Sequence, residues 1–289
     1  MTSHAWPLRQ PSARGVLDGH RRLLITAMDS SDYQAFLDEL VSRLEADPLV
    51  FGLITLGSTA DAAYRDRWSD HDFWVITSPG SQSKYLDTFS WLPRADDILL
   101  TARHGLSYRG VLYANKHQVE YAVFAPDEAA RGKIERFQVL IDRHNVAGLA
   151  ASIRLQTHGE RSAALARPDR LENLCMLLWT ACEKWERGER LSSQRYIQFS
   201  LDVFLDLLAA HDRLKKSHTA DGLDARRRLE QTEPELGREL GRMALLAPAE
   251  GGVRLLDLAE KELRARVPGL AWERVLVVKE WLREAGRAV

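Results

Sequence analysis

The sequence of 289 residues contains only two cysteines, Cys175 and Cys182, and both fall within one helical pattern. No Cys-x-x-Cys pair occurs, so the sequence indicates neither a thiolate zinc site nor a dithiol redox site. The two thiols are therefore expected to be core residues on one helix face. So few cysteines are typical of a reducing compartment, and we expect a cytoplasmic protein.

Long apolar runs are also missing. No stretch of about 18 apolar residues occurs, so we expect no transmembrane helix and no membrane partner. The first residues, MTSHAWPLRQPSARG, lack the apolar core of a signal peptide.

Neither sign of charge dominates, since 40 Lys and Arg residues face 41 Asp and Glu residues and leave a net charge of −1. Nucleic acids and anionic membranes select clustered positive charge, and no basic stripe or added binding module stands out. We therefore expect no nucleic-acid partner. The composition is typical of a globular protein, and the length allows one large domain or two ordinary ones. The oligomeric state stays open.

The first half of the chain combines helices with short β-rich runs. Residues 1–28 are mixed in composition and are predicted to form a loosely ordered arm. Apolar residues then recur at helical spacing and predict a helix over 31–46. A second helix is expected over 84–92. Apolar and β-rich runs predict strands, two of which form a hairpin around Ala-Asn-Lys-His; these strands cover 49–56, 71–77, 97–102, 107–113, 118–124 and 137–142.

From about residue 165 the apolar residues change to helical spacing throughout. One helix is marked by Leu171 to Trp185, and the next by Ile197 to Leu208, with Ser192 or Ser193 as its cap. Segments near 224–246, 253–265 and 271–285 continue the pattern, which predicts a bundle of five helices. The expected fold class is α+β. A mixed β-sheet domain with helices covers 29–150, and an all-α domain covers 151–289.

Two acidic residues, Asp70 and Asp72, stand at the start of the apolar run Phe73-Trp74-Val75-Ile76. Side chains two positions apart on a strand point to the same side, so these carboxylates converge while His71 points away. Carboxylates this close repel each other unless a cation joins them. Mg²⁺ prefers oxygen ligands and completes its shell with water and phosphates. The pair therefore predicts half of a phosphate-handling metal site.

Gly57 and Ser58 end the preceding apolar run. Glycine lets a backbone approach a phosphate closely, and N–H groups at a helix start attract anions. Ser58 and Thr59 are also expected to cap a short helix that continues through Tyr64. Ser58 as a hydrolase nucleophile is disfavoured, because no Gly-x-Ser-x-Gly pattern surrounds it.

A third acid, Glu120, is the only charge in the run Gln118 to Phe124. An acid inside an apolar strand is costly unless it is paired or bound to metal. If this strand lies beside the strand of Asp70 and Asp72, the three carboxylates meet. The alternative is an edge strand whose acid faces water. The nine histidines are scattered without metal-ligand spacing, and surface roles are expected for residues such as His104 and His117.

Together, Gly57-Ser58, Asp70-x-Asp72 and the single strand acid Glu120 resemble the nucleotidyltransferase superfamily of β-type DNA polymerases. Within it, the sequence is most similar to the aminoglycoside and lincosamide adenylyltransferases, which also join a catalytic domain to a helical one. The run FQVLIDRHN resembles their short strand that ends in an aspartate. The match covers residues 49–145 by motif and the rest by architecture only.

The resemblance implies an enzyme that uses Mg²⁺ to transfer a nucleoside monophosphate from a nucleoside triphosphate, with ATP expected, to a hydroxyl of a small antibiotic-like molecule. It implies that Asp70, Asp72 and Glu120 are catalytic and bind the metal, with Glu120 as the general base. It also implies that Gly57 and Ser58 grip the phosphates. In the helical half, Lys184 is a candidate ligand of the triphosphate, although a solvated helix end is the favoured interpretation of its segment.

Two other functions stay open at this stage. Transfer of AMP to a protein partner, as in toxin–antitoxin pairs, would use the same catalytic residues and differ only in the acceptor. A catalytically inactive nucleotidyltransferase fold used for binding is the third reading. The retained acids disfavour it, because an inactive site has no reason to keep carboxylates that repel each other.

Overall fold

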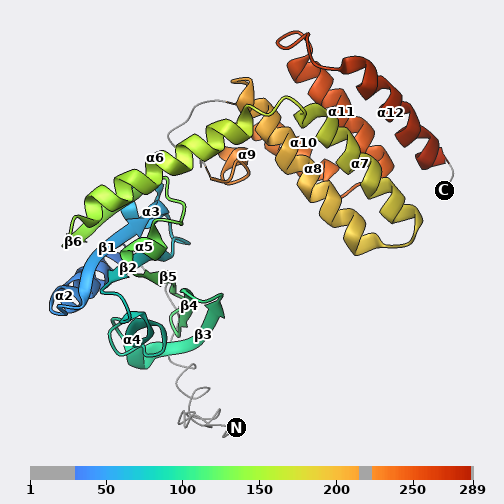
Figure 1. Ribbon diagram of the computed structural model, residues 1–289. Coiled ribbons are helices and arrows are strands. Elements are labelled where there is room, and N and C mark those ends of the chain that lie inside the picture. Colours follow the sequence, from blue (N-terminus) through green and yellow to red (C-terminus); the bar gives the residue numbers. More distant parts are fainter. Residues whose placement is uncertain (1–29, 215–222, 288–289) are drawn as a thin grey trace, which may run out of the picture. The chain divides into compact units, whose positions relative to one another are not determined.

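The computed structural model describes residues 30–214 and 223–287, and the predicted arm over 1–28 lies outside them. The chain divides into two compact units, Met1–Gln156 and Thr157–Val289 (Figure 1). The fold is α+β with a mixed six-stranded sheet, in agreement with the expected class. In the described ranges, every helix is too short or too polar to cross a membrane.

The first unit is built on the sheet, whose strand order is β3-β4-β5-β2-β1-β6. Strands β2 and β5 run parallel, and the other neighbouring pairs run antiparallel. The strands are β1 (Val50–Leu56), β2 (His71–Thr77), β3 (Ile98–His104), β4 (Tyr108–Tyr113), β5 (Gln118–Phe124) and β6 (Phe137–Asp142). Each strand predicted from the sequence is present, and the hairpin between β4 and β5 is confirmed, with Lys116 in the left-handed region of its turn.

The two faces of the sheet bury different sets of side chains because successive residues of a strand point in opposite directions. On the α2 face, Phe73 and Val75 of β2 pack with α2 (Ser30–Glu45) and α4 (Gln82–Leu86). On the α6 face, Trp74 and Ile76 pack with α5 (Pro126–Ala129) and with the first half of α6 (Val146–Leu165) (Figure 1).

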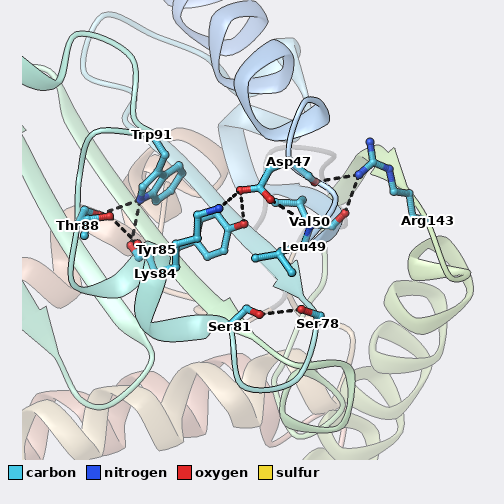
Figure 2. A network of polar contacts seen from close by, with 10 residues as sticks. All are labelled: Asp47, Leu49, Val50, Ser78, Ser81, Lys84, Tyr85, Thr88, Trp91 and Arg143. Atoms are coloured by element: carbon cyan, nitrogen blue, oxygen red, sulfur yellow. Dashed lines mark hydrogen bonds and ion pairs between the residues drawn. The ribbon is translucent and has the colours of Figure 1, made fainter.

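Asp47, between α2 and β1, ties several elements of the α2 face together (Figure 2). Its carboxylate accepts hydrogen bonds from Lys84 and from Tyr85 Oη at 2.7 Å, both on α4. Its carbonyl oxygen accepts from Arg143 Nη1 at 3.0 Å, just after β6. Burial alone would raise the pKa of Asp47, but the hydrogen bonds from Lys84 and Tyr85 outweigh it and hold that pKa below its ordinary value. These contacts fix α2 against the sheet.

Two helices of the first unit differ from the sequence prediction. The long helix α6 was not predicted, although Val146, Leu149, Ala150 and Ile153 follow helical spacing and pack on the sheet. The predicted helix over 84–92 is shorter, because α4 ends at Leu86 and the following chain turns so that the Trp91 indole donates to two backbone oxygens.

The described elements of the second unit are helical. They are α7 (Arg170–Glu186), α8 (Arg190–Ala210), α9 (Leu229–Thr232), α10 (Pro234–Met243), α11 (Pro248–Leu263) and α12 (Trp272–Arg287). Cys175 and Cys182 lie in their common core as expected, and burial raises the pKa of each thiol to about 12. The predicted cap of α8 is wrong, because the helix begins at Arg190 and Ser193 is buried, donating to the carbonyl of Ala181 at 2.7 Å.

Candidate active site

Asp72 and Glu120 are register partners on the parallel strands β2 and β5. Paired residues of neighbouring strands project to the same side of the sheet. Both carboxylates therefore belong to the α6 face, in the row that continues through Trp74 and Ala122 into the core of that face. The sheet topology thus brings together two acids that are far apart in the sequence.

Asp70 lies just before β2, with its side chain half-buried. The Tyr33 hydroxyl of α2 donates to its backbone carbonyl at 2.6 Å. Burial is the main cause that raises the pKa of Tyr33, and the charges of both Asp70 and Asp72 raise it further. The convergence of the Asp70 and Asp72 carboxylates stays a prediction.

Glu120 is exposed, and its Oε1 accepts a hydrogen bond from Gln118 Nε2 at 2.7 Å. Strand β5 lies between β4 and β2, so the edge-strand alternative is wrong, although the carboxylate does face outward. The partner of Glu120 on β4 is Gly110, and a Cβ atom there would lie 3.2 Å from His104 Nε2. The imidazole of His104 therefore covers the position next to Glu120.

Tyr108 of β4 adds a phenol to the same face, opposite Ala122. Its pKa is raised by burial first and then by the charge of Asp72, so its hydroxyl lies within electrostatic reach of that carboxylate. A place for Tyr108 or His104 on this face could not be predicted from the sequence, because each reaches it only through strand pairing.

The oxygen donors at this end of the sheet suit a hard divalent cation. In residues 30–214 and 223–287, no group of three His, Cys, Asp or Glu side chains is arranged to hold a metal ion by itself. Mg²⁺ does not require such a cage, since it commonly binds one or two carboxylates and takes its other ligands from water and substrate phosphates. The site of Asp70 and Asp72 has the donor chemistry for that role, and the three-carboxylate metal site stays a prediction.

Gly57 makes a sharp turn at the end of β1. Its φ is +52°, which favours glycine, and a Cβ there would meet no atom within 4 Å. The space beside this turn could admit a phosphate. The N–H of Gly57, however, donates to the carbonyl of Arg136 at 3.2 Å, so that amide is already used.

The helix predicted from Ser58 through Tyr64 is wrong in its extent. Helix α3 (Gly57–Ala60) has four residues and is separated from the 3₁₀ helix η1 (Ala62–Tyr64) by Asp61, whose backbone is extended. No side chain caps α3. So short a helix contributes little dipole, and the phosphate-binding role of Gly57 and the half-buried Ser58 stays a prediction.

Arg136 is a basic residue whose backbone lies beside the Gly57 turn. Its carbonyl bonds Gly57, and its guanidinium carbon lies 3.4 Å from the ring centroid of Tyr64. Lys184 lies in α7 of the second unit, where Nζ forms an ion pair with Glu189 Oε2 at 2.8 Å. Its assignment to the triphosphate stays a prediction.

His71 and His117 form a buried pair under the site, so the surface role expected for His117 is wrong. His71 Nε2 lies 3.1 Å from the Tyr33 carbonyl and must donate its proton, because a carbonyl only accepts. His71 Nδ1 then accepts from His117 Nε2 at 2.7 Å. Burial is the main cause that lowers the pKa of His71 to about 2 and of His117 to about 4.

No protein-family model and no curated protein matches the chain. Among solved structures, the chain is similar to an aminoglycoside 6-adenyltransferase from Bacillus subtilis, with a TM-score of 0.34 and 10% sequence identity over 88% of this chain and 98% of that chain. A likeness of this size is too small to assign a function, which is therefore inferred from the geometry of the site.

Proposed function

We propose that the protein is a nucleotidyltransferase that transfers a nucleoside monophosphate, with ATP as the expected donor, to a hydroxyl of a small molecule. The acceptors we favour are antibiotics of the aminoglycoside or lincosamide type. Mg²⁺ is the proposed cofactor, with Asp70 and Asp72 as its protein ligands and Glu120 as the third acid beside them.

The observation that carries this proposal is the meeting of three strands at one end of the sheet. The pairing of Thr55 with Phe73 sets the end of β1, and hence Gly57, beside the start of β2. The pairing of Asp72 with Glu120 sets the third acid on the other side of β2. Three features therefore lie side by side. They are an open glycine turn suited to phosphate, two aspartates suited to a cation, and an exposed carboxylate suited to accept a proton.

Each of these residues has a distinct part in the proposed reaction. The acceptor oxygen forms a bond to the α-phosphorus, the bond from that phosphorus to the pyrophosphate oxygen breaks, and the hydroxyl proton passes to the Glu120 carboxylate. Such general-base steps typically contribute about 10²–10⁴-fold. The Gly57 turn, Ser58 and Arg136 bind and orient the triphosphate. Bound Mg²⁺ would neutralise charge on the phosphates and the pyrophosphate.

Isothermal titration calorimetry of ATP with and without Mg²⁺ tests the first half of this proposal. We expect binding that requires Mg²⁺ and is lost when Asp70→Asn and Asp72→Asn are combined. Arg136→Ala should weaken ATP binding about tenfold, the size of one charge-assisted contact, whereas Arg131→Ala, which removes an exposed cation of the same unit, should not. Tight binding without metal, or no binding of any nucleoside triphosphate, would favour the catalytically inactive fold instead.

A screen of candidate acceptors tests the second half. Purified protein, ATP and Mg²⁺ would be incubated with aminoglycosides and lincosamides, and the products weighed by mass spectrometry. A mass gain of one nucleoside monophosphate on a small molecule, absent with Glu120→Gln, supports the proposal. A gain on a protein of a cell extract and on no small molecule would select AMP transfer to a protein.

A further inference from the structure

Thr59 of α3 connects the two halves of the proposed site. Its Oγ1 accepts a hydrogen bond from the backbone N–H of Asp72 at 2.9 Å and lies 3.3 Å from the carbonyl oxygen of Asp70. Thr59 itself is one residue beyond Ser58 and only 2% exposed. One buried hydroxyl therefore joins the backbone of both aspartates to the Gly57-Ser58 turn.

Tyr33 of α2 completes this contact from the other side. Its hydroxyl donates to the carbonyl of Asp70 at 2.6 Å and lies 2.9 Å from Thr59 Oγ1. Its ring stacks on the imidazole of His71 with centroids 3.6 Å apart, and its own carbonyl accepts from His71 Nε2. The peptide groups on both sides of His71 are thus held by side chains from two other elements.

We propose that Thr59 and Tyr33 are positioning residues that set the Asp70 and Asp72 carboxylates relative to the phosphate turn at Gly57 and Ser58. The inference rests on the proposed function, because it takes those carboxylates and that turn as the site. Neither hydroxyl needs to touch nucleotide or metal. Each acts through the backbone at the start of β2.

The alternative is that the two hydroxyls only satisfy buried backbone groups and stabilise the fold. A purely structural hydrogen bond would change unfolding when removed but would leave ligand binding by the folded protein intact. The two readings therefore differ in what happens to binding of Mg²⁺ with ATP once the protein is shown to be folded.

The experiment compares Thr59→Val, which keeps the shape and loses the hydroxyl, with Thr59→Ser, which keeps the hydroxyl. Exchange of the Asp72 amide proton is followed by NMR, and binding of Mg²⁺ with ATP is measured by calorimetry. We expect Thr59→Val to speed amide exchange and to weaken binding about 10- to 100-fold, since small displacements of reacting groups have effects of that size. Thr59→Ser should restore both. Tyr33→Phe should act in the same direction with a smaller effect.

The matched control is Thr55→Val. Thr55 is also fully buried, and its Oγ1 donates to the carbonyl of Gln138 at 3.2 Å, away from the aspartates. It should leave the Asp72 amide and ligand binding unchanged. If Thr59→Val folds but is too unstable for NMR, Tyr33→Phe takes its place.

The outcomes separate this inference from the proposed function. If the unaltered protein does not bind ATP with Mg²⁺, the proposed function fails, and the Asp72 amide alone decides whether Thr59 holds the strand. If the unaltered protein binds and Thr59→Val binds equally well, the proposed function stands and the positioning role is wrong. An Asp72 amide that exchanges no faster in Thr59→Val also overturns it.

Discussion

Strand β2 presents opposite chemistry to the two faces of the sheet. On the α2 face, His71, Phe73 and Val75 are fully buried among aromatic rings, and even the imidazole of His71 has partners for both nitrogens. On the α6 face, Trp74 and Ile76 are buried just as well, but Asp72 at the start of the row is half-exposed beside Glu120. The strand is optimised for burial everywhere except at one end of one face.

This difference separates stability from function within a single strand. Packed apolar side chains stabilise the fold in proportion to the area they bury, whereas adjacent carboxylates repel each other. Asp72 and Glu120 are not among the packed apolar side chains of the core, so they contribute little to stability through burial. Substitutions on the α2 face should therefore change unfolding, and substitutions of the acids should change binding or turnover.

Glu120→Gln is expected to have the largest effect, and it lies on the α6 face. The change keeps the shape of the side chain and removes its capacity to take a proton, so turnover should fall about 10²–10⁴-fold. The free energy of unfolding should stay within about 0.5 kcal/mol, because the side chain is exposed. Steady-state kinetics with the acceptor found by the screen, together with urea unfolding, measure both.

The control for that substitution is Asp127→Asn, which removes an exposed acid from α5 on the same unit. It should leave turnover unchanged. Equal turnover in Glu120→Gln and the unaltered protein would mean that Glu120 accepts no proton, and the α6 face would lose its proposed base.

The buried histidines of the α2 face should make the free energy of unfolding depend on pH. His71 and His117 have pKa values of about 2 and about 4 in the folded protein, chiefly because burial disfavours their charged forms, and of about 6.5 when unfolded. Below pH 6.5 the unfolded chain binds protons that the folded pair does not. The free energy of unfolding therefore falls as the pH drops below 6.5, by up to about 1.4 kcal/mol per pH unit for each histidine. His117 contributes to this slope down to about pH 4, and His71 contributes down to about pH 2.

Urea unfolding between pH 7 and 4.5 checks this slope. Carboxylates contribute little to the slope in this pH range. A group such as Asp47, with its lowered pKa, loses its stabilising effect only at more acidic pH. His117→Gln should remove about half of the slope. A free energy of unfolding that stays flat from pH 6.5 to 4.5 would show that the pair is protonated in the folded protein or is open to solvent.

The sequence was sufficient to predict the strands and the hairpin, because each depends on local spacing. It was not sufficient for contacts between distant residues. The hydrogen bond of His71 to His117 spans 46 positions, and that of Tyr33 to Thr59 spans 26, so no short pattern indicates either. Helix α6 is different, because Val146, Ala150 and Ile153 carry a helical spacing that is visible in the sequence.

The predicted capping role of Thr59 was wrong for a related physical reason. A threonine after a strand and a glycine can satisfy either the N–H groups of its own helix or a group elsewhere, and the sequence does not distinguish them. Here α3 is too short to compete, and the strand amide of Asp72 takes the hydroxyl. A hydrogen bond to a distant strand, and not to its own helix, thus determines the role of Thr59.

The smallest expected effect also lies on the α2 face, at the far end of β2. Thr77 is fully buried, and within the described residues its Oγ1 has no hydrogen-bond partner. Thr77→Val replaces that hydroxyl by a methyl group of similar size, which removes an uncompensated desolvation cost and should raise the free energy of unfolding by about 1 kcal/mol. Thr55→Val, which removes a hydroxyl that does have an acceptor, should lower it by about as much. Urea unfolding of the two variants side by side measures this difference. A loss of stability in both would show that the Thr77 hydroxyl also has a hydrogen-bond partner. The α2 face would then stabilise the fold through polar groups as well as through apolar packing.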